Sequence, residues 1–259
     1  QTNRWWTNSG VGSGVYVDET AARWVNIGVN DGVTTFSSVS NSAVLADGFI
    51  DWSCDCDFGD LDNDGDLDLF HSTYGGSFTG QVPSRIFLND GAGFFEEFNP
   101  SGYQLTGSSM PTGAPAIWAA GVFTPNTLNS NGSNADVCSD PLDIDLADMD
   151  GDLDLDVLHR ARDQQPRIST TRLEENGGVL PRFWDQTGAR LTQNASGAGN
   201  YEQELGDIDG DGDVDLYGLN WTGFTDIIAF NDGTGVFGPK ISLPGSGADD
   251  NEGDFFDYD

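Results

Sequence analysis

Aspartate recurs at every second position in three short segments, and this feature constrains the fold of the chain more than any other. We call the segments ladder one (Asp60–Asp68), ladder two (Asp148–Asp156) and ladder three (Asp207–Asp215). Position six is glycine in ladders one and three and Leu153 in ladder two. Carboxylates at this density repel one another unless a cation lies among them, and Ca²⁺, with roughly 6–8 oxygen ligands, is the usual ion. A solvated acidic run is the alternative, but three copies in the same phase favour metal sites.

Each ladder offers five carboxylates to its ion. We expect positions one, three, five and nine to bind through their side chains, and position seven through its backbone carbonyl. Glycine at position six lets the chain curl around the ion with a positive φ angle. We expect ladder three to be the most regular site and ladder two the weakest. The candidate calcium ligands are Asp60, Asp62, Asp64, Asp66, Asp68, Asp148, Asp150, Asp152, Asp154, Asp156, Asp207, Asp209, Asp211, Asp213 and Asp215.

The ladders do not match an EF-hand, which needs a bidentate glutamate at position twelve and a helix on each side. Position twelve is His71, His159 or Gly218. The residues after each ladder are branched and aromatic, which is typical of a strand. The sequence therefore predicts that each ion binds in a β-hairpin.

Phe58-Gly59 followed by ladder one resembles the FG-GAP/VCBS-type repeat, which is known from integrin α-subunit propellers and many bacterial secreted proteins. The second half of that repeat is matched by residues 85–95 and 226–237, and more loosely by residues 23–32 and 172–178. The resemblance implies an all-β fold. It further implies a β-propeller of four-stranded antiparallel blades, with Ca²⁺ held between the first two strands of a blade.

On this basis we expect residues 1–259 to form a single propeller or propeller segment. Its predicted parts are a partial blade (11–40), a blade (49–98), a rim insertion (99–137), two blades (138–185 and 201–240) and the start of a further blade (252–259). The chain is then an excerpt of a larger propeller, a ring that closes on itself, or a unit that joins head to tail into a filament. We expect residues 252–259 to pair with the strands around 15–36, in the same chain or the next.

The charge of the chain argues against nucleic acid as a partner, and the lack of a long apolar run argues against membrane insertion. Ten basic residues stand against 43 acidic ones, for a net charge of −33, whereas nucleic acid binding needs clustered Lys and Arg. No apolar run is long enough to insert into a membrane. Because Gln1 is not a start methionine and no signal sequence is present, we expect a processed product or a fragment. Weak carboxylate loops suit millimolar external calcium, which favours an extracellular, secreted protein.

The cysteines and sequons fit that setting. We expect Cys138 to form a disulfide with Cys54 or Cys56, and the alternative is three free thiols. Asn131, Asn194 and Asn220 begin N-glycosylation sequons, which predict a glycoprotein in a host that glycosylates.

The sequence contains little that indicates an enzyme. It lacks HExxH, Walker and G-x-S-x-G motifs, and the GxGxxG match at 233–238 lies in a predicted hairpin. His71 and His159 share a repeat phase, which is compatible with a lyase-type base, with a ligand facing a channel, or with inheritance through the repeat.

The seven tryptophans fall into two predicted groups. Those expected in loops are candidates for stacking on sugars, and the alternative is packing at the rim; they are Trp5, Trp6, Trp118 and Trp221. Trp24, Trp52 and Trp184 are expected to pack in strands.

Together these features predict a non-enzymatic, Ca²⁺-stabilised extracellular scaffold for adhesion or assembly, which polymerises head to tail with identical subunits or binds a protein partner. The alternative is a carbohydrate-binding lectin, or the propeller domain of a polysaccharide-active enzyme, with glycans as partners.

Overall fold

The structure is a computed structural model that describes residues 5–25, 53–73, 85–97, 141–161, 167–171, 183–191, 200–220, 224–248 and 253–255. These residues form antiparallel sheets with two single helical turns, which confirms the predicted all-β class. No closed propeller is detected among them, so closure into blades stays a prediction. Within the same residues, no helix is long and apolar enough to span a membrane.

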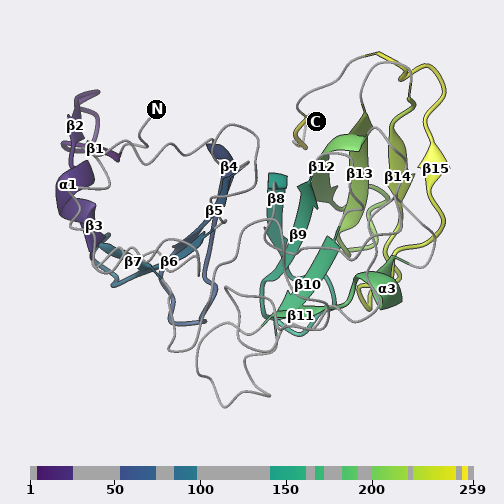
Figure 1. The fold of residues 1–259 in the computed structure, drawn as a ribbon, viewed down its shortest axis with the longest axis horizontal. Helices are drawn as coiled ribbons and strands as arrows, with labels where there is room; N and C mark the ends of the chain where they lie inside the picture. Colours follow the sequence, from purple (N-terminus) through teal and green to yellow (C-terminus); the bar gives the residue numbers. More distant parts are fainter. Residues whose placement is uncertain are drawn as a thin grey trace, which may run out of the picture.

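Two sheets have four strands in sequential order (Figure 1). One consists of β8 (Pro141–Ala147), β9 (Asp156–Ala161), β10 (Arg167–Thr171) and β11 (Phe183–Asp185). The other consists of β12 (Asn200–Gly206), β13 (Asp215–Asn220), β14 (Ile227–Ala229) and β15 (Ile241–Ser242). The second sheet reaches beyond the predicted boundary at residue 240, because β15 pairs with β14.

A third sheet has five strands, of which four follow the same order. These are β4 (Ser53–Gly59), β5 (Asp68–Thr73), β6 (Arg85–Asn89) and β7 (Phe95–Glu97). The fifth, β3 (Trp24–Val25), pairs in parallel with β7. Each ladder connects the first two strands of its sheet, and the strand predicted after each ladder is present as β5, β9 or β13.

The N-terminal part differs from the sequence prediction. Trp6, expected in a loop, begins strand β1 (Trp6–Asn8), which pairs only with β2 (Tyr16–Asp18) within the described chain. A helical turn that was not predicted, α1 (Thr20–Arg23), follows β2, and α3 (Thr187–Arg190) follows β11 in the same way. After each turn the chain meets the next sheet in parallel, at Trp24–Phe95 and at Leu191–Phe237.

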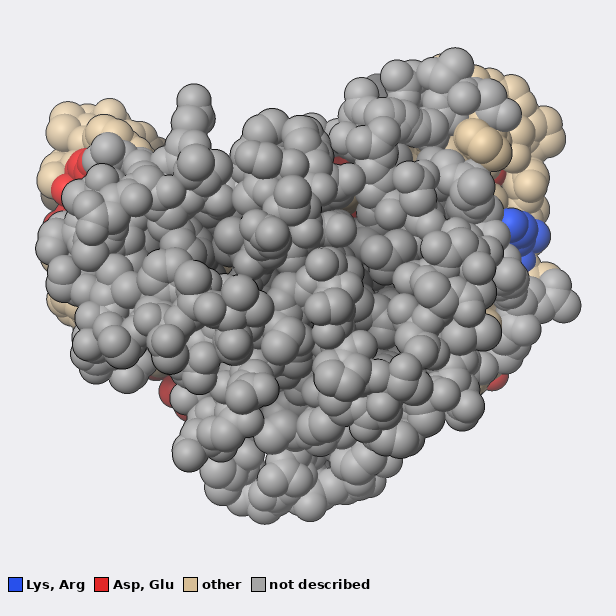
Figure 2. All heavy atoms as spheres, in the orientation of Figure 1, with Lys and Arg blue, Asp and Glu red and all other residues tan. Residues whose placement is uncertain are grey.

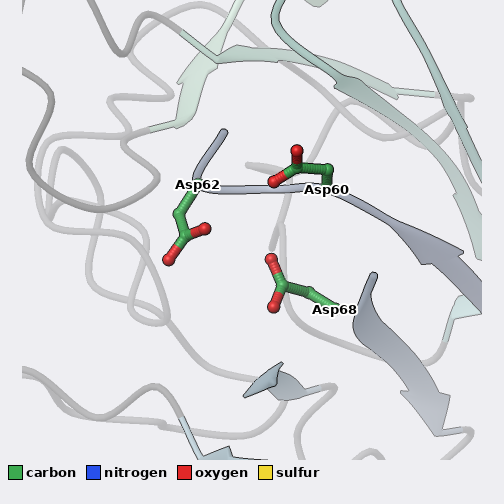
Figure 3. Close-up of side chains that lie close together, drawn as sticks. All are labelled: Asp60, Asp62 and Asp68. Carbon is green, nitrogen blue, oxygen red and sulfur yellow. The ribbon is translucent and has the colours of Figure 1, made fainter. Parts of the chain in front are cut away.

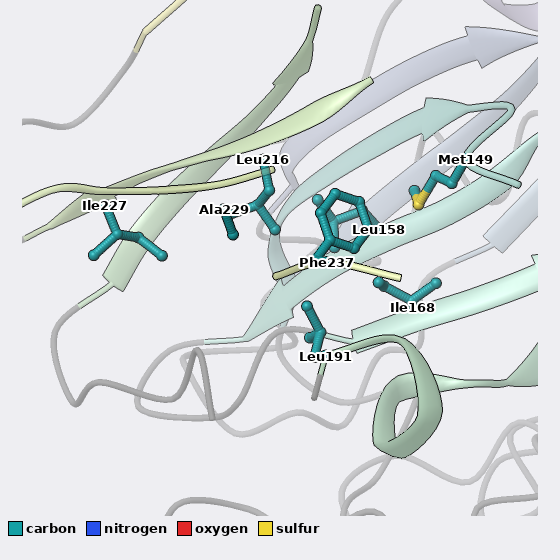
Figure 4. Close-up of a cluster of buried hydrophobic side chains, with 8 residues drawn as sticks. All are labelled: Met149, Leu158, Ile168, Leu191, Leu216, Ile227, Ala229 and Phe237. Atoms are coloured by element: carbon teal, nitrogen blue, oxygen red, sulfur yellow. The ribbon is translucent and has the colours of Figure 1, made fainter. Parts of the chain in front are cut away.

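The main hydrophobic core lies between the two four-stranded sheets (Figure 4). Its buried side chains come from strands of both sheets, from ladder two, from the position after α3 and from the turn between β14 and β15, and they are Met149, Leu158, Ile168, Leu191, Leu216, Ile227, Ala229 and Phe237. Burial of these apolar side chains holds the sheets face to face. The core therefore fixes ladders two and three relative to each other.

Residues 253–255 pack on the third strand-ladder-strand unit. The ring of Phe255 lies over Gly206 so closely that a Cβ there would overlap it, and it meets the ring of Tyr217 edge-on. Leu146 covers Gly59 in the same way, and it stands at the same position of its repeat as Phe255. Residues 253–255 form no strand pair with β1 or β2. Residues 26–36 and 256–259 lie outside the described residues, so the pairing of residues 252–259 with the N-terminal strands, in the same chain or the next, stays a prediction.

Candidate metal centres

The first aspartate of each ladder shapes its loop. Asp60 Oδ1 accepts a hydrogen bond from Asp64 N at 3.0 Å, and its Oδ2 accepts one from Gly65 N at 2.9 Å. Asp148 and Asp207 bind the equivalent backbone N–H groups of their own loops. These bonds curl all three loops in the same way.

Position six has a left-handed backbone in every ladder. Its φ angle is 96° at Gly65, 98° at Gly212 and 72° at Leu153. An L-residue other than glycine adopts this conformation at a cost of about 1–2 kcal/mol. Ladder two therefore keeps the curl of the other loops, but with a strained and 82% exposed Leu153.

The ninth aspartate joins each loop to the sheet and is buried. Asp68 Oδ2 accepts a hydrogen bond from Leu61 N, and Asp68 Oδ1 accepts one from Asn89 N at the end of β6. Burial raises the pKa of Asp68 to about 7 and that of Asp156 to about 8, although backbone hydrogen bonds oppose the shift. Asp215 makes the matching bonds to Ile208 N and Asn231 N.

The carboxylates converge at one point in each ladder. Oxygens of Asp60, Asp62 and Asp68 lie within 4.8 Å of one another and point into a common space (Figure 3). The corresponding groups are Asp148, Asp150 and Asp152 in ladder two, and Asp207, Asp209 and Asp215 in ladder three. The remaining candidate ligands, which are outside these groups, are Asp64, Asp66, Asp154, Asp156, Asp211 and Asp213.

Some of these remaining residues support the loops. Asp64 Oδ1 accepts a hydrogen bond from Asp66 N, and Asp211 Oδ1 accepts one from Asp213 N. The carboxylate of Asp66 lies against Gly91, in the turn after β6, and Asp213 lies against Gly233 in the equivalent turn.

The ladder residues fit a hard cation. Asp62 Oδ1 and Asp150 Oδ1 are buried and have no hydrogen-bond partner within the described part of the chain. Burial, followed by the charges of Asp64 and Asp60, raises the pKa of Asp62. All converging donors are oxygens, the ligands that calcium and magnesium prefer. These groups can therefore hold a metal ion, which would supply the missing partner and remove the repulsion.

Ladder two has side-chain partners that are not found for the other ladders among the described residues. Arg190, at the end of α3, forms an ion pair with Asp150, and Asn63 Nδ2 of ladder one donates to Asp154 Oδ1 at 2.6 Å. Two of its five carboxylates, Asp150 and Asp154, are therefore bound by side chains from other parts of the chain.

The cysteine and sequon predictions are only partly covered. Cys56 is a free, exposed thiol, so it does not form the predicted disulfide in this structure. Cys138 and the side chain of Cys54 lie outside the described residues, as do Asn131 and Asn194. Asn220 is described, and its buried side chain donates to Thr225 O at 2.7 Å, which leaves no room for a glycan.

The histidines that share a repeat phase and the GxGxxG match lie in strands and in a turn. His71 is buried and meets the ring of Phe87 edge-on, while the side chain of His159 is outside the description. Gly233 and Gly235, in the GxGxxG match, have positive φ angles in a turn between β14 and β15.

The tryptophans that were expected in loops differ in their surroundings. Trp5 stacks on Phe95 with ring centroids 4.5 Å apart, so it packs inside the structure. Trp6 is 57% exposed. Trp24 and Trp184 lie in strands as predicted. Trp52, Trp118 and Trp221 lie outside the described residues.

Two repeated patterns were not used in the sequence analysis. Asp18-Glu-Thr-Ala-Ala-Arg23 and Asp185-Gln-Thr-Gly-Ala-Arg190 form the two helical turns, and each arginine lies against a glycine of the next sheet, Gly93 or Gly235. A pair of acidic residues also stands five and three positions before each ladder. Aligning the chain on its ladder starts exposes the acid pairs, and comparing the segments after β2 and β11 exposes the arginines.

No protein-family model matches this chain, and no curated protein matches it at a significant level.

Proposed function

We propose that this chain is a Ca²⁺-stabilised segment of a β-propeller of the FG-GAP/VCBS type, and that it acts outside the cell as a non-enzymatic scaffold for adhesion or assembly. Three strand–ladder–strand units in sequential order support this proposal. Their first strands, β4, β8 and β12, lie side by side (Figure 1), as the innermost strands of propeller blades do.

The observation that carries the calcium part is the convergence of three carboxylates in each ladder. An ion there would link the two strands that flank the loop, so metal binding would stabilise the fold itself. Asp60, Asp62 and Asp68 would hold one ion, with the equivalent groups holding two more. On the face drawn in Figure 2, the described residues show acidic atoms at several places and basic atoms at one edge, in line with the net charge.

Thermal unfolding with excess Ca²⁺ and with excess EGTA tests this part. One site at a hundredfold excess over its Kd adds about 2.7 kcal/mol, and each kcal/mol shifts the Tm of a chain this size by about 2–4 °C. We expect Asp209→Ala to lose part of the calcium-dependent shift. Asp232→Asn, a change at an exposed turn residue outside the ladders, should keep it. Equal melting temperatures in calcium and EGTA would refute the calcium part.

The assembly part is supported by the hairpin of β1 and β2. Within the described chain it has no third strand, and its exposed apolar side chains are Trp6, Val11, Val15, Tyr16 and Val17. A free strand edge beside apolar side chains suits strand addition by a partner. We propose an identical subunit as that partner, which would build a head-to-tail filament.

Light scattering after size-exclusion chromatography tests assembly. In calcium, we expect a mass that rises with protein concentration, and a smaller rise for the double variant Trp6→Ser, Tyr16→Ser. A single monomer mass at all concentrations would contradict self-assembly while leaving the calcium part intact.

Carbohydrate binding is the second candidate, and one observation favours it. Trp6 and Tyr16 are exposed by 57% and 60%, and the strand register puts them on the same face of the hairpin. Exposed aromatic rings that share a face can stack on sugars. Screening on a glycan array should then give a signal that Trp6→Ala abolishes; no binding to any glycan would remove this candidate.

A further inference from the structure

Acidic side chains join the first strands of neighbouring sheets. The residues five and three positions before each ladder are Asp55 and Asp57, Asp143 and Asp145, and Glu202 and Glu204. Asp55 Oδ2 accepts a hydrogen bond from Ile144 N, and Asp57 Oδ2 accepts one from Leu146 N, both at 2.9 Å. The acid pair of β4 therefore binds the backbone of β8.

The same contact is only half made between β8 and β12. Asp143 Oδ2 accepts a hydrogen bond from Gln203 N at 2.6 Å, which matches the bond of Asp55. The bond that would match that of Asp57 is missing, because Asp145 Oδ2 is buried and has no partner within the described residues.

Strand register places three polar side chains in one gap. Asp145 lies opposite Leu158, and Leu205 lies opposite Leu216. Opposite residues share a face of a sheet, as do residues two apart along a strand. Because Leu158 and Leu216 both belong to the core between the sheets, Asp143, Asp145 and Gln203 also point into this gap.

The gap is closed to solvent at Gln203, and the side-chain amide of this residue is unpaired. Only 1% of Gln203 is exposed, and neither its amide oxygen nor its amide nitrogen has a partner in the described structure. An unpaired buried polar group is costly, about 1–3 kcal/mol each. A proton on Asp145 would turn one carboxylate oxygen into a donor, which the unpaired amide oxygen of Gln203 could accept.

A metal ion is a poorer solution for this gap than a proton. In the ladders three carboxylates converge within 4.8 Å, whereas no such group is found around Asp143 and Asp145 in the described residues. The acids are spread along the strands instead, where each can take its own proton.

The charges around the gap are mainly negative. Asp55 and Asp57 of β4 bind the backbone of β8 beside it, Glu202 and Glu204 are close on β12, and Arg160 on β9 lies opposite Asp143 in the register. His159, also on β9, lies opposite Ile144. Burial, followed by the charge of Asp55, raises the pKa of Asp143 well above its usual value. Burial, followed by the charge of Asp143, raises the pKa of Asp145 to about 10.

We propose that the gap between β8 and β12 is a pH-dependent clasp, which holds the two sheets together while Asp143 and Asp145 share at least one proton and which loosens when both are ionised. The folded protein then binds more protons than the unfolded chain. The stabilisation is complete below the ordinary aspartate pKa of about 4 and is lost as the pH rises through the folded pKa values.

Asp145→Asn tests the clasp, because asparagine keeps the shape and supplies a permanent donor. Unfolding by denaturant is measured between about pH 5 and 9, in calcium and in EGTA. One extra proton in the folded state changes the unfolding equilibrium constant by up to tenfold per pH unit. We expect the variant to lose this slope and to be more stable than the parent at the alkaline end. Asp57→Asn, at the same repeat position but with its hydrogen bond to Leu146 N in place, should retain the slope.

Infrared spectroscopy gives a second readout, which can be taken on the parent protein alone. In saturating calcium the parent protein should show the carbonyl band of a protonated carboxyl group near neutral pH, and folded Asp145→Asn should show less of it. Absence of that band in the parent would overturn the proposal, as would equal pH slopes for the parent and Asp145→Asn.

Discussion

Arg190 Nη2 donates to Asp150 Oδ2 at 2.6 Å, so a cationic side chain binds the third position of ladder two. Both side chains are only 12% exposed, so solvent screens the pair weakly. In the other ladders no such ion pair is found among the described residues. The arginine neutralises one carboxylate and would repel a divalent ion in the same loop. This relationship gives a physical reason for the expectation that ladder two is the weakest site.

Removing that arginine should therefore strengthen calcium binding at ladder two. We expect Arg190→Gln to tighten the weakest binding step on the order of tenfold and to lower stability in EGTA, because Asp150 loses its partner. Calorimetric titration with Ca²⁺ measures the first effect. Arg23→Gln is the matched control, since Arg23 ends the equivalent helical turn but pairs with Glu19. An unchanged weakest step in Arg190→Gln would show that the ion pair does not limit binding.

Relief of the backbone strain in ladder two should stabilise the protein. Leu153→Gly removes the cost of a left-handed leucine and loses little packing, because the side chain is exposed. We expect a gain of about 1 kcal/mol in the free energy of unfolding by denaturant. The reverse change in ladder three, Gly212→Leu, should cost a similar amount. A loss of stability in Leu153→Gly would mean that the side chain makes a contact that outweighs the strain.

Calcium affinity should depend on pH near neutrality. The pKa values of Asp68 and Asp156 are raised to about 7 and about 8 by burial, so these groups are partly protonated at neutral pH without metal. An ion needs them ionised, so binding should release protons and weaken as the pH falls through these values. Without metal, the stability of the fold depends on pH in the opposite direction to calcium affinity. The raised pKa values stabilise the fold at low pH, and this stabilisation is lost as the pH rises. Calorimetry in two buffers of different ionisation enthalpy measures the proton release, and heats that are equal after buffer correction at neutral pH would argue against it.

Position nine should matter even without calcium. Asparagine at residue 215 can accept only through one oxygen, so Asp215→Asn leaves Ile208 N or Asn231 N without its partner. We expect a loss of about 1–3 kcal/mol in EGTA. Asp209→Asn should cost stability chiefly in calcium, because its carboxylate is at position three of the converging group. Denaturant unfolding of both variants in both conditions separates the two roles, and equal losses for both in EGTA would contradict the distinction.

Features encoded by local spacing could be predicted from the sequence. The alternating aspartates and the strand-like residues after them correctly predicted β5, β9 and β13. This prediction was possible because the loop and the strand that follows it are adjacent in the sequence. The positive φ angle at position six also follows from the loop, and it holds even where Leu153 replaces glycine.

Features that depend on which segments meet in space could not be predicted. The pairing of Arg190 with Asp150 joins residues 40 positions apart, and nothing in either local segment indicates it. Asn220 matches a sequon, but its place in β13 buries it. Trp5 and Trp6 are neighbours in sequence, yet one stacks on Phe95 and the other is exposed, because strand β1 starts between them.

Native mass spectrometry tests the central claim most directly. The protein is sprayed after equilibration with Ca²⁺ and, in parallel, with EGTA, and the number of bound ions is read from the mass difference. Three converging carboxylate groups predict three calcium ions per chain. As free calcium is lowered, the ion of ladder two should be lost first. A mass that is identical in calcium and in EGTA would contradict the account.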